Sequence, residues 1–167
     1  IHHFQMLSLW LNEHYLPLLH MIEKQFLLRL HADFNAFFQQ WFLALVEDEH
    51  LHISLSDAFS PLIEQNGYAI DYLHLSGGEK TAAALAYRLA LNQVINTVMS
   101  VIKTRDLIIL DEPTDGFSDE QLERMRNVLH ELKVRQLIIV SHEQKIESFV
   151  DSVIQLEKHG HASMVVQ

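Results

Sequence analysis

The chain of 167 residues contains no cysteine. This absence excludes disulfide bonds, thiolate nucleophiles and cysteine-based zinc sites within the chain, and it favours a reducing, intracellular compartment. Long hydrophobic runs are also absent, because polar residues and Pro17 interrupt the most apolar stretch well short of the about 18 residues that a membrane span needs. No signal-peptide pattern is present either. We therefore expect no membrane span.

Positive charge is scarce, with 12 Lys and Arg against 22 Asp and Glu and a formal net charge of −10. An acidic surface repels phosphate backbones unless its basic residues cluster, so nucleic-acid binding by this chain alone is disfavoured. The pattern G-x-x-x-x-G-K-[ST] is missing as well. That glycine-rich loop and its lysine supply most of the grip on a bound triphosphate. Any triphosphate handled here would need this loop from a partner.

The residues that are present suit one folded domain, since 49% are hydrophobic and 20% are charged. Disorder is not expected with this composition. The first residue is Ile1 instead of methionine, which we interpret as the sign of a fragment or a processed product.

Apolar residues recur at three- and four-residue steps from about Phe4 to Val46, which predicts helix. Pro17 is expected to bend or interrupt this helix, and Asp33 or Asn35 to start a second segment. The apolar positions extend beyond one narrow face. One side should therefore pack on the domain and another should meet a second helix or protein, with ordinary core helices as the alternative.

Residues 51–55 alternate strictly between apolar and polar, which predicts a half-buried strand. Residues 61–65 and 68–72 flank Asn66-Gly67, a strong signal for a two-residue hairpin turn. We therefore expect a small antiparallel sheet here.

Two histidines, His50 and His52, lie two residues apart at the first of these strands and could share a metal ion. Metal sites need three or four ligands, and the spacing offers no third one. Solvent-facing histidines are therefore the favoured interpretation.

The segment Leu75-Ser76-Gly77-Gly78-Glu79 carries a capping box, because Glu79 follows Ser76 by three residues and can close the start of a helix. Each of the two glycines in the first turn costs about 1 kcal/mol relative to alanine, so the pair needs a reason. A backbone without Cβ can approach a ligand closely, and the free N–H groups of a helix start attract anions. A γ-phosphate fits this description; a plain glycine-containing loop is the alternative.

Residues 107–110 form a continuous apolar run that predicts a strand buried on both faces of a parallel sheet. Asp111 and Glu112 emerge at its C-terminal end, where open α/β sheets place their chemistry. Adjacent strand residues point to opposite sides, so the two carboxylates need different roles. One can hold Mg²⁺, and the other can act on an attacking water as a general base. The alternative is two acidic residues ahead of the turn at Pro113.

A second capping box, formed by Ser118 and Gln121, predicts a helix that runs through Leu132. Residues 136–140 form the next buried strand, which completes a strand-helix-strand unit with parallel strands.

His142 follows that strand and lies at the same sheet edge as the two carboxylates. An imidazole there could contact the γ-phosphate or the attacking water. A short helix over residues 143–149 should follow, and residues 152–156 and 162–166 should form a terminal hairpin around Lys158-His159-Gly160.

Three motifs, at residues 75–79, 110–114 and 141–142, together resemble the C-terminal ATPase lobe of the ABC superfamily. The likeness covers roughly residues 66–167. Residues 80–91 and the Asp-Glu-Pro-Thr string are most similar to the Rad50 family of DNA double-strand-break-repair ATPases, whereas SMC proteins more often show Asp-Glu-Val-Asp. In that family an N-terminal lobe carries the phosphate loop, a long coiled coil with a zinc hook follows, and the C-terminal lobe completes the head. The resemblance accounts for the missing loop.

The resemblance implies an α/β fold for residues 33–167, as the C-terminal lobe of an ABC-type ATPase head with a mostly parallel sheet flanked by helices and small antiparallel hairpins. Residues 1–32 would form a helical coiled-coil root. Asp111 should assist Mg²⁺, Glu112 should activate water, and His142 should sense the γ-phosphate.

The start of the signature helix is implied to bind ATP through Ser76, Gly77, Gly78 and Glu79. Ser76 and Gly78 would contact the γ-phosphate of ATP held by an opposing head, so ATP would join two heads. Arg88 matches a basic residue that the family uses to couple this helix to the rest of the head.

The implied partners are an N-terminal ATPase lobe of the same protein, a second head, an Mre-eleven-type nuclease docked at the coiled-coil root, and DNA through the assembled complex. The implied cofactors are ATP and Mg²⁺, with zinc only in a hook outside this chain. Such a protein would work in the cytoplasm or nucleoid of a prokaryote or in a eukaryotic nucleus.

The chain departs from the superfamily at residues 117 and 118, where Leu-Asp is usual. Phe117 keeps the apolar character, and Ser118 loses the carboxylate unless Asp119 substitutes for it. Two other interpretations stay open: an SMC-type or transporter ATPase fragment, and a non-catalytic interaction module that binds only partners.

Overall fold

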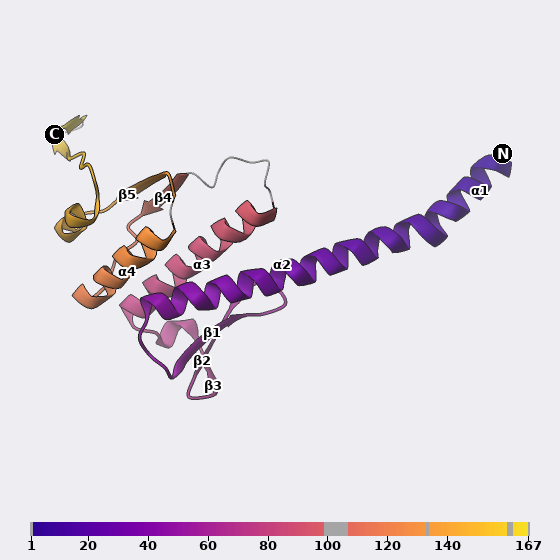
Figure 1. Ribbon diagram of the computed structural model, residues 1–167, viewed down its shortest axis with the longest axis horizontal. Helices are drawn as coiled ribbons and strands as arrows, with labels where there is room; N and C mark the ends of the chain where they lie inside the picture. Colours follow the sequence, from indigo (N-terminus) through magenta and orange to yellow (C-terminus); the bar gives the residue numbers. More distant parts are fainter. Residues whose placement is uncertain (1, 99–106, 133, 160–161, 167) are drawn as a thin grey trace.

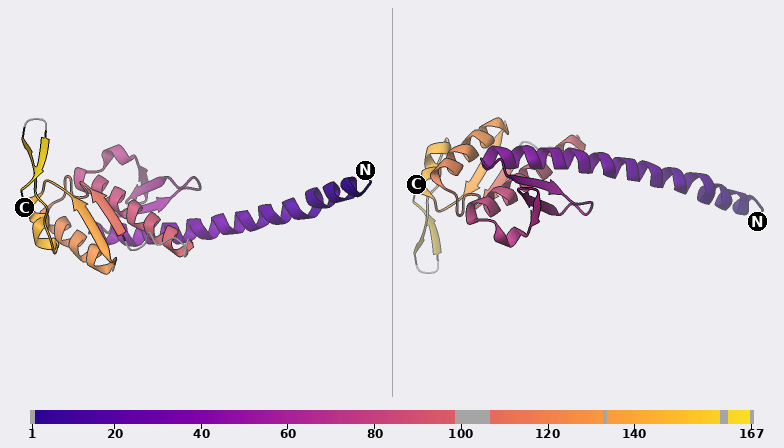
Figure 2. Two further views of the ribbon diagram at one scale, coloured as in Figure 1. Left: turned by 90° about the horizontal axis from the view of Figure 1, so that it is seen from above. Right: turned by 90° about the horizontal axis from the view of Figure 1, so that it is seen from below.

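The computed structural model describes residues 2–98, 107–132, 134–159 and 162–166. A long helical rod projects from a lobe of helices and small sheets, and the two ends of the chain lie at opposite ends of the molecule (Figure 1). Figure 2 shows that the rod curves gently along its length.

The rod consists of α1 (His2–Trp10), a π-helical turn η1 (Leu11–Tyr15) and α2 (Leu16–Leu45), which follow one another without a break. Pro17 lies in the first turn of α2. Proline has no N–H to donate to the preceding turn, and just before it the N–H of Leu16 donates to the carbonyl of Leu11, five residues back. Pro17 therefore changes the hydrogen-bond pattern without breaking the helix.

The predicted second helix start at Asp33 or Asn35 is wrong, because α2 runs through both residues. The side chain of Asn35 serves another element instead, since its Oδ1 accepts a 2.8 Å hydrogen bond from the backbone N–H of Leu55. A residue type that favours helix caps is thus used here for a tertiary contact.

Burial divides the rod into two parts. All residues from 2 to 29, which we call the arm, are exposed, and the first fully buried residue is Phe34. The second half of α2 supplies much of the core through Phe34, Phe38, Trp41, Phe42 and Leu45.

The predicted antiparallel sheet is confirmed and consists of β1 (Leu51–Leu55), β2 (Pro61–Gln65) and β3 (Tyr68–Ile70) in that order. Asn66 and Gly67 form the hairpin turn with φ of 53° and 80°, the left-handed pair that a type I′ turn requires.

The third strand is shorter than predicted, because Tyr72 begins the 3₁₀ helix η2 (Tyr72–His74). Of the two histidines at the first strand, His50 lies in the preceding turn and His52 is exposed on β1. Among the residues that the structure describes, no cluster of three or more His, Asp or Glu could hold a metal ion.

The signature helix α3 (Gly77–Val98) packs along the second half of α2 (Figure 1). Its buried face is rich in small side chains, which allow the two helix backbones to approach closely. They are Ala82, Ala83, Ala86 and Ala90. The indole N–H of Trp41 on α2 donates to Oε1 of Gln93 on α3 at 3.0 Å, so the packing also satisfies a buried polar group.

The predicted strand-helix-strand unit is confirmed. β4 (Leu107–Asp111) and β5 (Gln136–Val140) pair in parallel, with α4 (Asp119–Glu131) between them in sequence. The parallel sheet nevertheless has only these two strands in the described ranges, so the expectation of a mostly parallel sheet is wrong for this chain. An α/β lobe with separate small sheets is the correct description.

The expectation that residues 107–110 are buried on both faces is also wrong. Ile108 and Leu110 lie in the core, whereas Leu107 is exposed and Ile109 is 62% exposed. Burial alternates because only one face of the strand pair packs against the core of this chain.

The C-terminal part contains the 3₁₀ helix η4 (Gln144–Phe149) and a hairpin of β6 (Leu156–His159) and β7 (Ala162–Val165). The hairpin is confirmed, but its first strand lies later than the predicted residues 152–156, and Gly160 of the predicted turn lies outside the described residues. No helix in the described parts of the chain is long and apolar enough to cross a membrane.

Candidate functional site

The two acidic residues after the apolar run differ in backbone conformation. Asp111 is the last residue of β4, whereas Glu112 has a φ of 44°, in the left-handed region that residues with a Cβ seldom adopt. The N–H of Glu112 still donates to the carbonyl of Val140 at 2.9 Å, so the turn remains anchored to the end of β5. Strained positions of this kind concentrate at functional sites.

This turn brings Glu112 to the residue that follows β5. Nδ1 of His142 lies 2.9 Å from Oε2 of Glu112, and both side chains are exposed. The hydrogen bond to His142 holds the pKa of Glu112 below its ordinary value, and the same bond and the carboxylate charge raise the pKa of His142. The two residues therefore lie at one sheet edge, as predicted, and they also contact each other, which was not predicted.

A buried threonine supports this edge. Thr114 is 2% exposed, and its Oγ1 lies 3.4 Å from Oγ of Ser141, which in turn accepts a 3.1 Å bond from the N–H of Glu143. The turns after β4 and β5 are thus tied to each other. Sequence reasoning assigned Thr114 no role of its own, although its place directly after Asp-Glu-Pro could have suggested one.

The predicted capping box at the start of α3 is present. The N–H of Ser76 donates to Glu79 Oε2 at 2.7 Å, and the N–H of Glu79 donates to Ser76 Oγ at 3.3 Å. The carboxylate of Glu79 therefore closes the helix start. Ser76 and Gly77 are exposed, whereas Gly78 is buried.

A cavity of about 230 Å³ lies between α3 and the end of β4. Asp111 and Glu112 line it from the strand, and Lys80 and Arg88 line it from the helix. The structure therefore brings the predicted coupling residue Arg88 to the same cavity as both carboxylates. Ser76, Gly77, Gly78, Glu79 and His142 are not among the residues that line this cavity.

The exposed carboxylate of Asp111 suits Mg²⁺, which is usually held by one or two carboxylates together with waters and substrate phosphates. A site of that kind needs no cluster of protein ligands.

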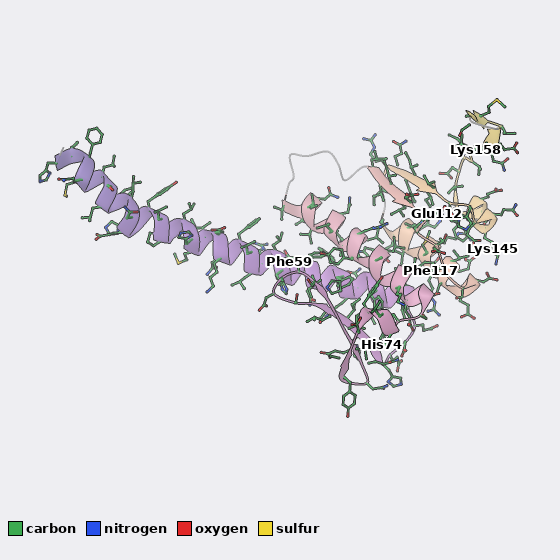
Figure 3. The ribbon with its side chains drawn as sticks, turned by 180° about the vertical axis from the view of Figure 1, so that it is seen from behind. Phe59, His74, Glu112, Phe117, Lys145 and Lys158 are labelled. Carbon is green, nitrogen blue, oxygen red and sulfur yellow. The ribbon has the colours of Figure 1, made fainter. Side chains whose placement is uncertain are left out.

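The departure at Ser118 has a structural role. Ser118 caps α4 in the predicted capping box with Gln121, with mutual bonds of 3.1 and 3.3 Å. Serine and aspartate are both good N-cap residues, so this replacement preserves the helix start. Asp119 forms an ion pair with Lys145 of η4. Figure 3 labels Lys145 and Glu112, which lie near this edge.

One face of the parallel strand pair carries exposed apolar side chains. They are Leu107 and Ile109 on β4 and Ile138 and Val140 on β5. We call these four residues the open sheet face. Ile109 and Ile138 are direct partners in the strand register, so the apolar side chains are continuous across the two strands.

Curated relatives match this chain over most of its length. The Rad50 DNA double-strand break repair ATPase of Methanococcus maripaludis is 29% identical over 157 residues, which cover 93% of this chain and 13% of the relative. The Rad50 ATPase of Thermoplasma acidophilum is 33% identical and covers 68% of this chain and 12% of the relative. The chain thus spans about an eighth of the length of these relatives. No model of a protein family matches the chain.

Solved structures of SMC heads share the fold. The Smc head domain with coiled coil and joint from Pyrococcus yayanosii has a TM-score of 0.69 at 19% identity and covers 91% of this chain and 30% of that one. A structure from a study of ATP-driven dimerization of SMC ATPases has a TM-score of 0.65 at 20% identity and covers 86% and 88%. The chain is thus similar in sequence to part of the Rad50 DNA double-strand break repair ATPases and has the fold of an SMC ATPase head.

Proposed function

We propose that this chain is the C-terminal part of a Rad50-type ATPase head, which hydrolyses ATP only when another lobe supplies the phosphate-binding loop. The observation that carries the proposal is the contact between Glu112 and His142 at the carboxyl ends of the two parallel strands. The sequence similarity to Rad50 ATPases supports it.

Three residues at this edge would divide the work on one nucleotide. Asp111 would hold Mg²⁺, which supplies charge neutralisation to the phosphates. Glu112, with its pKa lowered by His142, is ionised at neutral pH and can accept a proton from the attacking water. His142, with its pKa raised by Glu112, can donate a hydrogen bond to a phosphate oxygen.

The start of α3 would serve a second nucleotide. The capped turn presents backbone N–H groups at the positive end of a 22-residue helix, and Ser76 and Gly77 are exposed there. We assign Ser76, Gly77, Gly78 and Glu79 to the ATP of an opposing head, so that ATP would join two heads.

The open sheet face is the natural place for the N-terminal lobe. Parallel strands are normally covered on both faces, and an exposed apolar face of this kind marks a surface that binds another protein or lobe. The missing strands and the missing phosphate loop would arrive together on that lobe.

The arm would be the root of a coiled coil, with the lobe beginning at residue 33. Its exposed apolar side chains, among them Leu7, Leu18 and Phe26, would meet the second helix of the coil and an Mre-eleven-type nuclease. DNA would be bound through the assembled complex, and the protein would act inside the cell, in the nucleoid or nucleus.

The test combines this chain with its N-terminal lobe and measures ATP hydrolysis. Glu112→Gln should lower the rate by about 10² to 10⁴, because it removes the proton acceptor, and should accumulate ATP-bound head dimers. Glu131→Gln, at an exposed position at the end of α4, is the matched control and should keep the rate. An unchanged rate for Glu112→Gln would refute the catalytic assignment.

The SMC-head fold favours one second candidate, an SMC-type chromosome-maintenance ATPase. The sequence upstream in the full gene distinguishes the Rad50-type from the SMC-type candidate, because each predicts its own N-terminal lobe and coiled coil. A transporter would instead carry the phosphate loop on the same compact domain. A non-catalytic module predicts no nucleotide-dependent association in any pairing.

A further inference from the structure

Two turns far apart in sequence are in direct backbone contact. One is the start of α3, residues 75–79, and the other is the loop after β4, residues 113–118. Gly116 has a φ of +77°, and a Cβ added there would lie 3.2 Å from the carbonyl carbon of Gly77. Glycine at position 116 therefore permits both the left-handed turn and the close approach.

Gly78 has a packing reason as well. A Cβ at this position would lie 2.3 Å from Oε1 of Gln121 and 3.0 Å from the carbonyl oxygen of Gly116. An added Cβ at Gly77 meets only an ordinary contact, 4.0 Å from Cα of Gly116. Gly78 is therefore required by the fold itself, apart from any ligand at the helix start.

A side-chain hydrogen bond reinforces the contact. Oγ1 of Thr81, one turn into α3, donates to the backbone carbonyl of Asp115 at 2.6 Å. Gln121, whose side chain fills the space beside Gly78, is itself held by its bond to the N–H of Ser118. Each residue thus joins α3 to the loop that follows the two carboxylates.

We propose that Thr81 and Gln121 are positioning residues that hold the start of α3 and the loop after Glu112 as one rigid unit. The inference rests on the proposed function, in which these two turns serve different nucleotides. A rigid link then transmits the arrival of the opposing head's ATP at Ser76 to the turn that carries Asp111 and Glu112. Neither residue needs to touch ATP.

This link makes a prediction that separates binding from coupling. Thr81→Val keeps the shape of the side chain and removes the donor. In the complete ATPase, ATP binding by separate heads should stay unchanged, because the phosphate loop provides it. ATP-dependent dimerisation and the turnover of the dimer should each fall about five- to tenfold, as expected for one lost hydrogen bond.

The helix contains a matched control. Thr97, also on α3, donates its hydroxyl to the carbonyl of Gln93 at 2.9 Å, far along the helix from the turn. Thr97→Val loses a hydroxyl bond of the same kind and should dimerise normally. Thr81→Ser restores the donor and should recover dimerisation, which a loss caused by unfolding of α3 would not explain.

The outcomes distinguish the two proposals. If the unaltered protein forms no ATP-dependent dimer, the proposed function fails. If it dimerises and Thr81→Val dimerises as tightly as Thr97→Val, the positioning role of Thr81 is overturned. Should Thr81→Val not fold, Gln121→Ala replaces it in the same assay: it removes the side chain beside Gly78, and normal dimerisation would overturn the inference.

Discussion

The arm and the second half of α2 are both rich in apolar residues, but the arm is exposed and the second half of α2 is largely buried. Phe26 in the arm is 49% exposed, whereas Phe38, only twelve residues further along, is 0% exposed. The backbone is helical in both places, so helix formation follows from the local pattern. Burial depends on which other elements lie beside the helix, and among the described residues the core elements pack against the second half of α2.

A cluster of rings marks the border between the two halves. Phe34 lies 4.9 Å from Tyr87 of α3 and 6.1 Å from Phe59, measured between ring centroids. His31 lies 5.1 Å from Phe59 and donates through Nε2 to the carbonyl of Ser56 at 2.8 Å. Figure 3 shows Phe59 where the helix meets the lobe. The loop between β1 and β2 thus packs against the helix and hydrogen-bonds to it at the point where the arm ends.

The largest difference between the halves should appear on truncation of one phenylalanine in each. Phe38→Ala should lower the free energy of unfolding by about 3 to 5 kcal/mol, because it removes a fully buried ring and leaves a cavity. Phe26→Ala should change it by less than about 0.5 kcal/mol, because its position in this chain is exposed. Urea unfolding followed by circular dichroism measures both.

Equal losses for the two variants would contradict this division, since they would require the arm to pack against the lobe in solution. In the presence of a bound coil partner, Phe26→Ala should become costly while Phe38→Ala keeps its effect. That shift would identify the arm as the partner-binding half.

A smaller effect should follow from one hydroxyl at the border. Tyr87 donates to the carbonyl of Phe59 at 3.1 Å, so Tyr87→Phe should cost about 0.5 to 1.5 kcal/mol. Tyr15→Phe in the arm removes a hydroxyl from an exposed ring and should cost nothing measurable. Thermal unfolding of the two variants measures both effects. A Tyr87→Phe protein as stable as the unaltered protein would show that ring packing alone holds the loop.

The features that the sequence predicted correctly are those that depend on residues close together in the chain. Both capping boxes, the Asn66-Gly67 turn and the strand-helix-strand unit are present because each depends on contacts within a few residues or on chain connectivity. The site edge was predictable for the same reason, since parallel strands place Glu112 and His142 side by side.

Features that depend on distant partners were not predictable in this way. The burial of residues 107–110 was overestimated, because an apolar run does not say whether a cover for its second face belongs to the same chain. The bond from Thr81 to Asp115 joins residues 34 positions apart and leaves no local pattern. Asn35 resembles a helix cap in sequence, and only the position of Leu55 reveals its use.

The smallest predicted effect tests a contact that belongs to the lobe alone. Glu112→Gln should lower the pKa of His142 toward its ordinary value of 6.5, because the hydrogen bond to a carboxylate and its charge are what raise it. NMR titration of the imidazole signals measures this. The signals of histidines in the exposed arm provide the internal control for this comparison.

The pH dependence of the pair follows from the two directions. The raised pKa of His142 means that its contribution to stability is complete below 6.5 and is lost as pH rises through the folded value. The lowered pKa of Glu112 means that its contribution is complete above 4.5 and is lost as pH falls through the folded value. The contact should therefore be strongest between these two values, and both side chains are exposed, so its effect on unfolding should be slight. A His142 titration that is identical with and without the Glu112 carboxylate would show that the two groups do not interact in solution, and would remove the observation on which the division of work at this edge depends.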